Sequence, residues 1–237
     1  MPSTNRYPSV TAHDDICQVY PDVFLLRGSI KLGPAARINR NMVIIRESNE
    51  LTLINPVRMD DARLSQLDDL GCVKHIVRLG DFHGLDDRFY LNRYQCEFWA
   101  QANQKTYTLP IPTKLLAQDS ELPFSGAELF EFKLTTHSEA AIIIKKHKLL
   151  ITTDSIQYHD DWHYFSLPAK LVFRLLGFKK GVNIGPPWLK QVTPKGGSIK
   201  EDFDRLLQLD FDALISAHGV WLRAGAKRLL RDEVKGI

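Results

Sequence analysis

The stretch Val73–Asp87, with the sequence Val-Lys-His-Ile-Val-Arg-Leu-Gly-Asp-Phe-His-Gly-Leu-Asp-Asp, determines how the rest of the chain is interpreted. The β-branched pair Ile76-Val77 predicts a buried strand, and the turn after it gathers three carboxylates and an imidazole. Carboxylates this close repel one another unless protons or a cation separate them. The simpler interpretation is a solvated turn, so the choice depends on the remaining segments.

Length and composition describe an ordinary globular protein. The chain has 237 residues, of which 44% are hydrophobic and 25% charged, so it is long enough to bury a substantial core. Its formal charge is only +3 and it has no dense Lys/Arg block, so nucleic acid is not an expected partner.

The three cysteines, Cys17, Cys72 and Cys96, form no Cys-x-x-Cys pair, which favours a reducing compartment. The first residues are polar and lack a signal-like apolar segment, and no apolar run is long enough to span a bilayer. We therefore expect a soluble cytoplasmic protein with no membrane partner, compatible with a homo-oligomer. At this length the chain could form one large domain or two small ones.

Alternating patterns predict strands and helices in layers. Residues 41–46 and 51–55 form a hairpin around a polar turn, a helix follows from the Asp60-Asp61 cap to Gly71, and 73–79 is a strand. Later elements are predicted at 88–96 (a short helix leading to a strand), 128–134 (strand), 140–152 (hairpin), 200–209 (helix), 211–215 (strand) and 223–234 (helix). This order favours an α/β layered fold.

Potential metal ligands recur where predicted strands end. They are Asp81, His83, Asp86 and Asp87 after 73–79, His137 after 128–134, Asp154 after 149–152 and His218 after 211–215. Strand ends on one edge of a sheet lie close together, and α/β folds place their sites there. Imidazoles and carboxylates together suit zinc, iron or manganese.

At these residues the chain resembles the metallo-β-lactamase superfamily. The first family motif, His-x-His-x-Asp-His, falls on Asp81-Phe-His-Gly-Leu-Asp-Asp87, where Asp81 and Asp87 replace histidines and one residue is inserted, so this motif is degenerate. The later family ligands fall on His137, Asp154 and His218.

The resemblance implies a single domain over residues 1–237, folded as a four-layer αββα sandwich. It also implies a hydrolase in which one or two divalent metals, zinc first and iron or manganese next, activate a hydroxide. Its substrate would be a small-molecule ester, thioester, lactam or phosphodiester. His83, His137 and His218 would be ligands, Asp154 would bridge, Asp86 would be a ligand or the general base, and Asp81 and Asp87 would be additional ligands.

Residues 159–195 are predicted to be an insertion of helix and loop facing the substrate. Its aromatics Trp162, Tyr164 and Trp188 would line an apolar pocket. The alternative is that these rings only pack the inserted helix, because aromatic side chains dominate cores in general.

Two other functions remain open from the sequence. The chain could be a catalytically silent binding protein that keeps the fold with a degenerate metal site, or the extra carboxylates could support redox chemistry at a di-iron centre. Metal content separates the first of these from the hydrolase.

Overall fold

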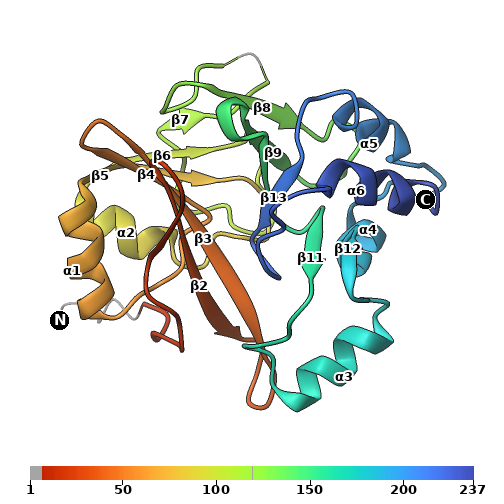
Figure 1. The fold of residues 1–237 in the computed structure, drawn as a ribbon, viewed down its shortest axis with the longest axis horizontal. Helices are drawn as coiled ribbons and strands as arrows, with labels where there is room; N and C mark the ends of the chain where they lie inside the picture. Colours follow the sequence, from red (N-terminus) through yellow and green to blue (C-terminus); the bar gives the residue numbers. More distant parts are fainter. Residues whose placement is uncertain (1–6, 119) are drawn as a thin grey trace.

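The computed structural model describes residues 7–118 and 120–237, and the first half of the chain forms a seven-stranded sheet (Figure 1). Its strands lie in sequence order: β1 (Cys17–Tyr20), β2 (Val23–Lys31), β3 (Arg37–Glu47), β4 (Glu50–Ile54), β5 (Cys72–Arg78), β6 (Glu97–Ala100) and β7 (Lys114–Leu115). The first four strands are antiparallel to their neighbours, whereas β4 to β7 run parallel.

The second half of the chain forms a four-stranded sheet in the order β13-β10-β9-β8. Its strands are β8 (Ala127–Glu131), β9 (Ala140–Ile144), β10 (Leu149–Thr152) and β13 (Ala213–Ser216), and a 3-10 turn at Lys145–His147 joins β9 to β10. A small ribbon pairs β11 (Gln157–His159) with β12 (Gly181–Asn183).

Alternating side chains on the strands explain why the two sheets stack. On β3, Val43 and Ile45 face the core between the sheets, whereas Met42 and Ile44 face helices on the outer side. Burial of apolar groups on both faces of a strand requires a further layer on each side. The two sheets therefore pack face to face.

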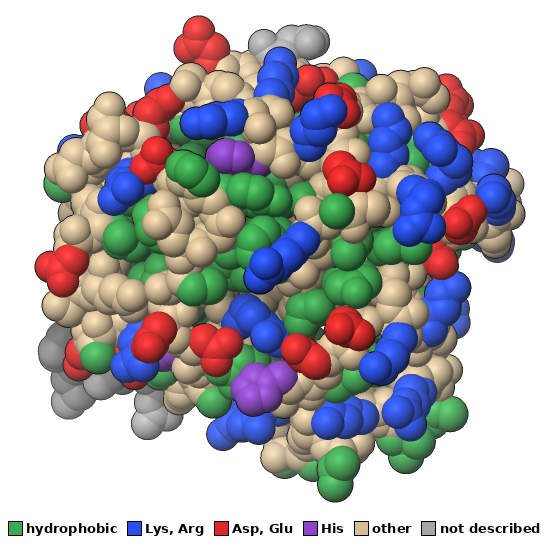
Figure 2. Space-filling view, in the orientation of Figure 1, with side chains coloured by type: hydrophobic (Ala, Val, Ile, Leu, Met, Phe, Trp, Pro, Cys, Tyr) green, Lys and Arg blue, Asp and Glu red, His purple; other side chains and the backbone are tan. Residues whose placement is uncertain are grey.

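Helices cover both outer faces. Helices α1 (Asp61–Leu70) and α2 (Asp87–Tyr94) pack on the first sheet, and α4 (Pro186–Val192), α5 (Lys200–Leu206) and α6 (Ala226–Val234) pack on the second. The result is an αββα sandwich, as the resemblance implies. Helix α3 (Leu167–Leu175) extends away from both sheets, and apolar side chains show at the same lower edge of the molecule in Figure 2.

Local signals placed most elements correctly. Asp60 caps α1 by accepting a hydrogen bond from the Arg63 backbone, and the predicted hairpin turn lies between Glu47 and Glu50. The predicted segment 159–195 contains α3, β12 and α4.

The hairpin of β2 and β3 is paired from Val23–Ile45 to Lys31–Arg37, so β3 begins at Arg37, before the strand predicted at 41–46. The half of the hairpin nearer its turn is held by polar contacts, because the buried residues Asn39 and Asn41 form hydrogen bonds there to the second half of the chain.

The cysteines and the helices bear on disulfide formation and on membrane insertion. All three cysteines are free thiols. Within the described part of the chain, no helix has the length and apolar character needed to cross a membrane.

Candidate metal centre

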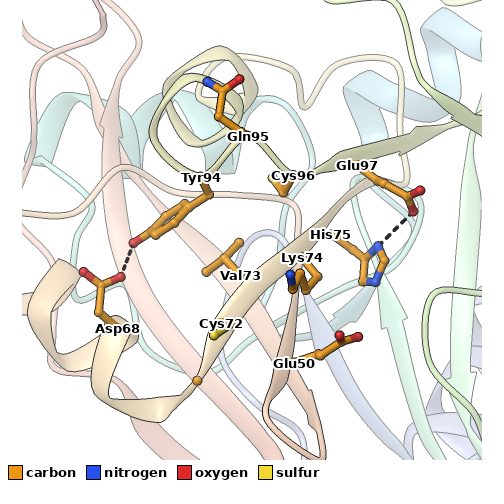
Figure 3. A pocket seen from close by; sticks show the side chains of 11 residues that line it. Glu50, Asp68, Cys72, Val73, Lys74, His75, Tyr94, Gln95, Cys96 and Glu97 are labelled. Carbon is orange, nitrogen blue, oxygen red and sulfur yellow. Dashed lines mark hydrogen bonds and ion pairs between the residues drawn. The ribbon is translucent and has the colours of Figure 1, made fainter.

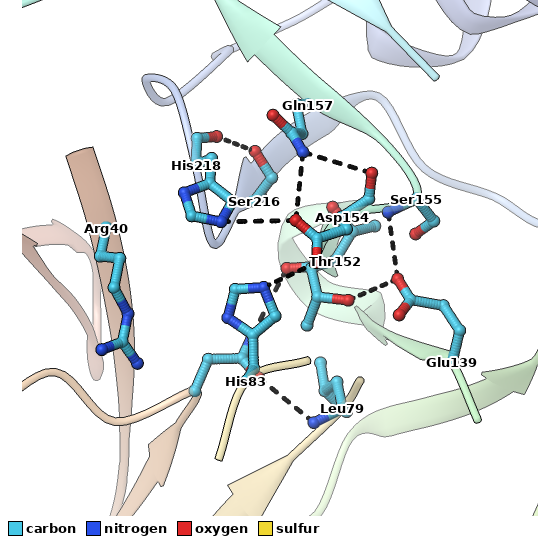
Figure 4. Close-up of polar contacts among 12 residues, drawn as sticks. Arg40, Leu79, His83, Glu139, Thr152, Asp154, Ser155, Gln157, Ser216 and His218 are labelled. Atoms are coloured by element: carbon cyan, nitrogen blue, oxygen red, sulfur yellow. Dashed lines mark hydrogen bonds and ion pairs between the residues drawn. The ribbon is translucent and has the colours of Figure 1, made fainter. Parts of the chain in front are cut away.

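Three loops from both sheets bring His83, Asp154 and His218 together (Figure 4). His83 follows β5 in the first sheet, whereas Asp154 and His218 follow β10 and β13 in the second. Strands β10 and β13 are parallel and pair Thr152 with Ser216, so both ligand candidates lie two residues past the last pair. This register places them side by side.

The spacing of the donor atoms fits a metal ion. Asp154 Oδ2 lies 3.1 Å from His83 Nε2, and Asp154 Oδ1 lies 3.4 Å from His218 Nε2. Ligand atoms around a tetrahedral zinc with bonds of about 2.0–2.2 Å lie roughly 3.4 Å apart. Each imidazole is therefore near coordination spacing from one carboxylate oxygen, and one ligand atom from each of the three residues lies within 4.8 Å of the others.

The orientation of His218 also suits a ligand. Its Nδ1 lies 2.7 Å from the carbonyl oxygen of Asn39 and donates to it, so the other ring nitrogen, Nε2, keeps its lone pair. Asn39 further binds the backbone of Gly219 through both its amide nitrogen and its oxygen. Such partners fix the tautomer of metal-bound histidines.

The protonation of the group favours cation binding. Burial raises the pKa of Asp154, but the adjacent His83 and His218 outweigh burial, and the net pKa is well below the usual range. Burial lowers the pKa of His83, although Asp154 partly opposes this. An ionised carboxylate beside a neutral imidazole is the state that a metal ion requires.

Two predicted ligands have other partners. Asp81 is fully buried and accepts hydrogen bonds from the backbone nitrogens of Lys105 and Thr106 and from the Thr106 hydroxyl. Asp87 begins α2 and lies 3.4 Å from the buried guanidinium of Arg78. Neither belongs to the cluster, because each serves a local structural contact.

Asp86, predicted as a catalytic residue, forms a buried ion pair. Its Oδ2 lies 2.7 Å from Arg40 Nη1 and also accepts from the Arg58 backbone nitrogen. Arg40 donates its other terminal nitrogen to the Pro56 carbonyl. The carboxylate is therefore neutralised by a side chain of β3, and Arg40 lies across from His83 (Figure 4).

His137 also stays outside the cluster. Its ring packs against Phe82 with the centroids 5.2 Å apart, and its Nδ1 contacts the hydroxyl of Thr136. It lines a separate surface cavity of about 520 Å³ beside Lys105.

An apolar cavity of about 280 Å³ adjoins the cluster and includes Asp154 and His218 in its wall. Trp188, Phe82 and Phe178 supply apolar wall. Of the three predicted substrate-binding aromatics, only Trp188 lines this cavity, and it also packs edge-on against Phe132 in the core.

Trp162 and Tyr164 have packing roles instead. Trp162 stacks on His159 and contacts Phe165, whereas the Tyr164 hydroxyl donates to Asp14. The alternative that these rings pack the inserted segment describes both of them.

A larger cavity of about 650 Å³ lies at the opposite edge of the first sheet (Figure 3). It is lined by the starts of β5 and β6, including Cys72, Cys96 and Glu97, whereas His83 follows the end of β5. His75 and Glu97 pair with each other there at 3.2 Å. In the described residues, no third metal-ligating group joins this pair.

Sequence reasoning missed Arg40, Asn39 and Glu139. Glu139 is fully buried, and its Oε1 accepts hydrogen bonds from the Ser155 backbone nitrogen and the Thr153 hydroxyl, which flank Asp154. Burial, with Asp154 adding to it, raises the pKa of Glu139 to about 8. Asn39 and Arg40 precede the apolar run at 42–45, and Glu139 precedes β9, so no local pattern in the sequence marks any of the three.

Comparison with known proteins supports the fold. No protein-family model matches the sequence, and no curated protein matches it significantly. Among solved structures, the DIM-1 metallo-β-lactamase exposed to ceftazidime is 12% identical over 97% of this chain and 99% of its own, with a TM-score of 0.68.

Two further structures agree. The metallo-β-lactamase FIM-1 from Pseudomonas aeruginosa, in its mono-zinc form, is 11% identical over 97% of each chain, with a TM-score of 0.66. A metallo-β-lactamase from Erythrobacter litoralis is 10% identical over 94% of this chain and 92% of its own, with a TM-score of 0.65. The chain therefore has the metallo-β-lactamase fold, in a strongly divergent sequence.

Proposed function

We propose that the chain is a metal-dependent hydrolase in which His83, Asp154 and His218 hold one divalent metal ion. The observation that carries this proposal is the convergence of the three side chains, whose ligand atoms lie within 4.8 Å of one another. Three protein ligands with a remaining open position are the arrangement of catalytic zinc sites. Iron and manganese are the competing occupants, because the same donor set suits them.

A single ion is favoured over a pair. The groups that would hold a second ion are engaged elsewhere: Asp86 with Arg40, Asp81 with Thr106, and His137 with Thr136. Arg40 and Asp86 form a buried ion pair on that side of the centre, so the Asp86 carboxylate is already balanced there without a second ion.

The chain's own residues would prepare the reaction. A bound metal would lower the pKa of a coordinated water toward about 7 and so supply the nucleophile. The Asn39 carbonyl keeps the Nε2 of His218 directed at the centre. Trp188 with Phe82 would offer an apolar wall for the substrate.

The pocket supports the substrate class that the resemblance implies. An ester, thioester, lactam or phosphodiester with an apolar substituent would fit a cavity of about 280 Å³ that has acidic and imidazole groups at one end. Small-molecule sites commonly combine an apolar lining with a few directed polar groups.

Metal analysis of purified variants tests the proposal. We expect about one equivalent of metal in the natural protein, and a loss of affinity of more than about 100-fold in Asp154→Ala and His218→Ala, since even outer partners of ligands contribute 10–100-fold. His137→Ala is the matched control and should retain its metal. Hydrolysis of ester, thioester, lactam and phosphodiester probes should follow metal content.

Other results would point elsewhere. Unchanged metal content in Asp154→Ala would refute the ligand assignment, and two equivalents would refute the single-ion site. A protein that takes up no metal under replete conditions would be the silent binding protein that the degenerate first motif leaves open.

A further inference from the structure

Helix α3 presents an apolar stripe to solvent. Leu167, Leu171 and Leu175 recur every four residues and are 80%, 61% and 79% exposed. The opposite face of the helix packs against the protein, because Ala169 and Phe173 are buried in a small core with other apolar residues. Exposed apolar residues are ordinary when scattered, but a contiguous patch marks an interaction site.

The patch extends beyond the stripe. Val172 and Leu176 on the same segment are also exposed, and so is Leu32 at the end of the β2–β3 hairpin. Leu32 and Leu176 line one cavity together, so the hairpin and the helix lie side by side there. The green side chains at the lower edge of Figure 2 belong to this region.

The segment of sequence that carries the patch is basic, although Lys179 and Lys180 lie near the acidic Glu233 and Asp160. Residues 162–200 contain no Asp or Glu and seven Lys or Arg residues, although the chain as a whole has 28 acidic and 31 basic residues. The rest of the chain therefore carries an excess of acid, and the positive charge concentrates in this segment. On α3, Lys170 and Arg174 each precede a stripe leucine and border the stripe by helical periodicity.

The patch is continuous with the candidate metal centre. The cavity that contains Asp154 and His218 is also lined by Leu32, Phe173 and Leu176, which belong to the patch or to the helix beneath it. Whatever covers the patch therefore lies at the mouth of the site.

We propose that α3 and the Leu32 hairpin tip dock on an anionic lipid surface. An amphipathic helix with leucines on one side and lysine and arginine at its border lies in the membrane interface. Basic residues near it add attraction to anionic headgroups. A second copy of this chain is a poorer occupant, because two patches of the same positive charge would repel.

Docking on a lipid surface would also determine which substrates reach the cavity. If the proposed hydrolase function holds, the mouth of its cavity faces the lipid, and the substrate is an amphiphile whose apolar chain enters between Leu32 and Leu176. The docking itself stands apart from catalysis and is tested without substrate.

Vesicle sedimentation tests the docking with the full chain, without added metal or substrate. We expect the protein to bind vesicles of phosphatidylcholine with phosphatidylserine, and to bind phosphatidylcholine alone more weakly. Replacing Leu167, Leu171 and Leu175 by serine should reduce binding at least about tenfold. The matched control is the double variant Leu109→Ser with Ile111→Ser. These two apolar residues lie outside the patch and are 70% and 74% exposed, and the double variant should bind normally.

A second variant tests the charge. Reversing Lys170 and Arg174 to glutamate should weaken binding by about fivefold or more for each charge. Reversing Lys145 and Lys146, which are exposed on the β9–β10 turn, should leave binding unchanged. Added salt should weaken the natural protein's binding, because salt screens exposed charges.

Failure of the natural protein to bind the anionic vesicles would overturn the proposal, as would normal binding by the leucine variant. If the natural protein does not bind vesicles but forms a dimer, and the leucine variant is monomeric, the occupant of the patch is a second copy of the chain. Any of these results leaves the hydrolase proposal to its own metal analysis.

Discussion

Asp86 and Asp87 are adjacent in sequence but neutralise different arginines. Asp86 pairs with Arg40 at 2.7 Å, and Asp87 lies 3.4 Å from Arg78. Burial raises the pKa of Asp87 to about 7, although Arg78 and Arg40 both oppose that shift. A buried charge that loses its partner is far costlier than the pair itself.

Removing Asp87 tests whether it is structural. Asp87→Ala leaves the Arg78 guanidinium buried without its carboxylate, so we expect the free energy of unfolding to fall by about 3–5 kcal/mol. Chemical denaturation measures this. Metal content in the remaining folded protein should stay normal, and a selective loss of metal at unchanged stability would make Asp87 a ligand after all.

Glu139 should impose a pH dependence on stability. Its pKa is raised from 4.5 to about 8 in the folded protein, so the folded state binds the extra proton. Its contribution is complete below about pH 4.5 and is lost as the pH rises to about 8. The slope for one proton is at most about 1.4 kcal/mol per pH unit.

Glu139→Gln removes that proton and should flatten the decline in unfolding free energy between about pH 5 and pH 8. Denaturation at several pH values, with metal chelated, measures the slope. Glu128→Gln, at a more exposed position on β8, is the control and should keep the natural slope. An equal slope in Glu139→Gln would mean that Glu139 is ionised in the fold.

At the scale of elements, the turn after β13 carries His218 and depends on Gly219. Gly219 has φ +87°, and a side-chain carbon there would lie 2.0 Å from the carbonyl oxygen of Tyr158 on β11. The backbone of Val220 binds that same carbonyl. A side chain at position 219 would therefore separate the turn from β11 and displace His218.

Gly219→Ala should lower both stability and metal affinity. The strained backbone alone costs about 1–3 kcal/mol, and the collision with Tyr158 adds to it. Gly196→Ala is the matched control, because Gly196 has φ +72° and a side-chain carbon there would meet no atom within 4 Å. This control should show only the backbone cost. Thermal unfolding and metal titration compare the two, and equal effects would show that the approach of Tyr158 is unimportant.

At the scale of the whole molecule, the candidate centre joins the two sheets. Its ligands come from loops after β5, β10 and β13, so a bound ion connects segments up to 135 positions apart, from His83 to His218. Asn55 adds a neutral link at the same edge, because it accepts from the Leu79 backbone and donates to the Thr152 carbonyl. Metal binding should therefore favour the folded state as a unit.

Metal should raise the thermal midpoint of the natural protein. A ligand at 100 times its dissociation constant stabilises the fold by about 2.7 kcal/mol, equivalent to roughly 5–10 °C for a chain of this size. Calorimetry with zinc and with a chelator measures the shift. His218→Ala should show no shift, and an equal shift in that variant would place the binding site elsewhere.

Periodicity and caps within a few residues were enough to predict α1, the β3–β4 hairpin and the layered class, because those signals act over a single turn or strand. They also marked seven strand-end side chains as candidate ligands. Which of them converge was decided by distant partners: Asp86 by Arg40 and Asp81 by Thr106. The charge of a buried carboxylate depends on what the fold packs against it, and no local pattern encodes a partner 46 residues away.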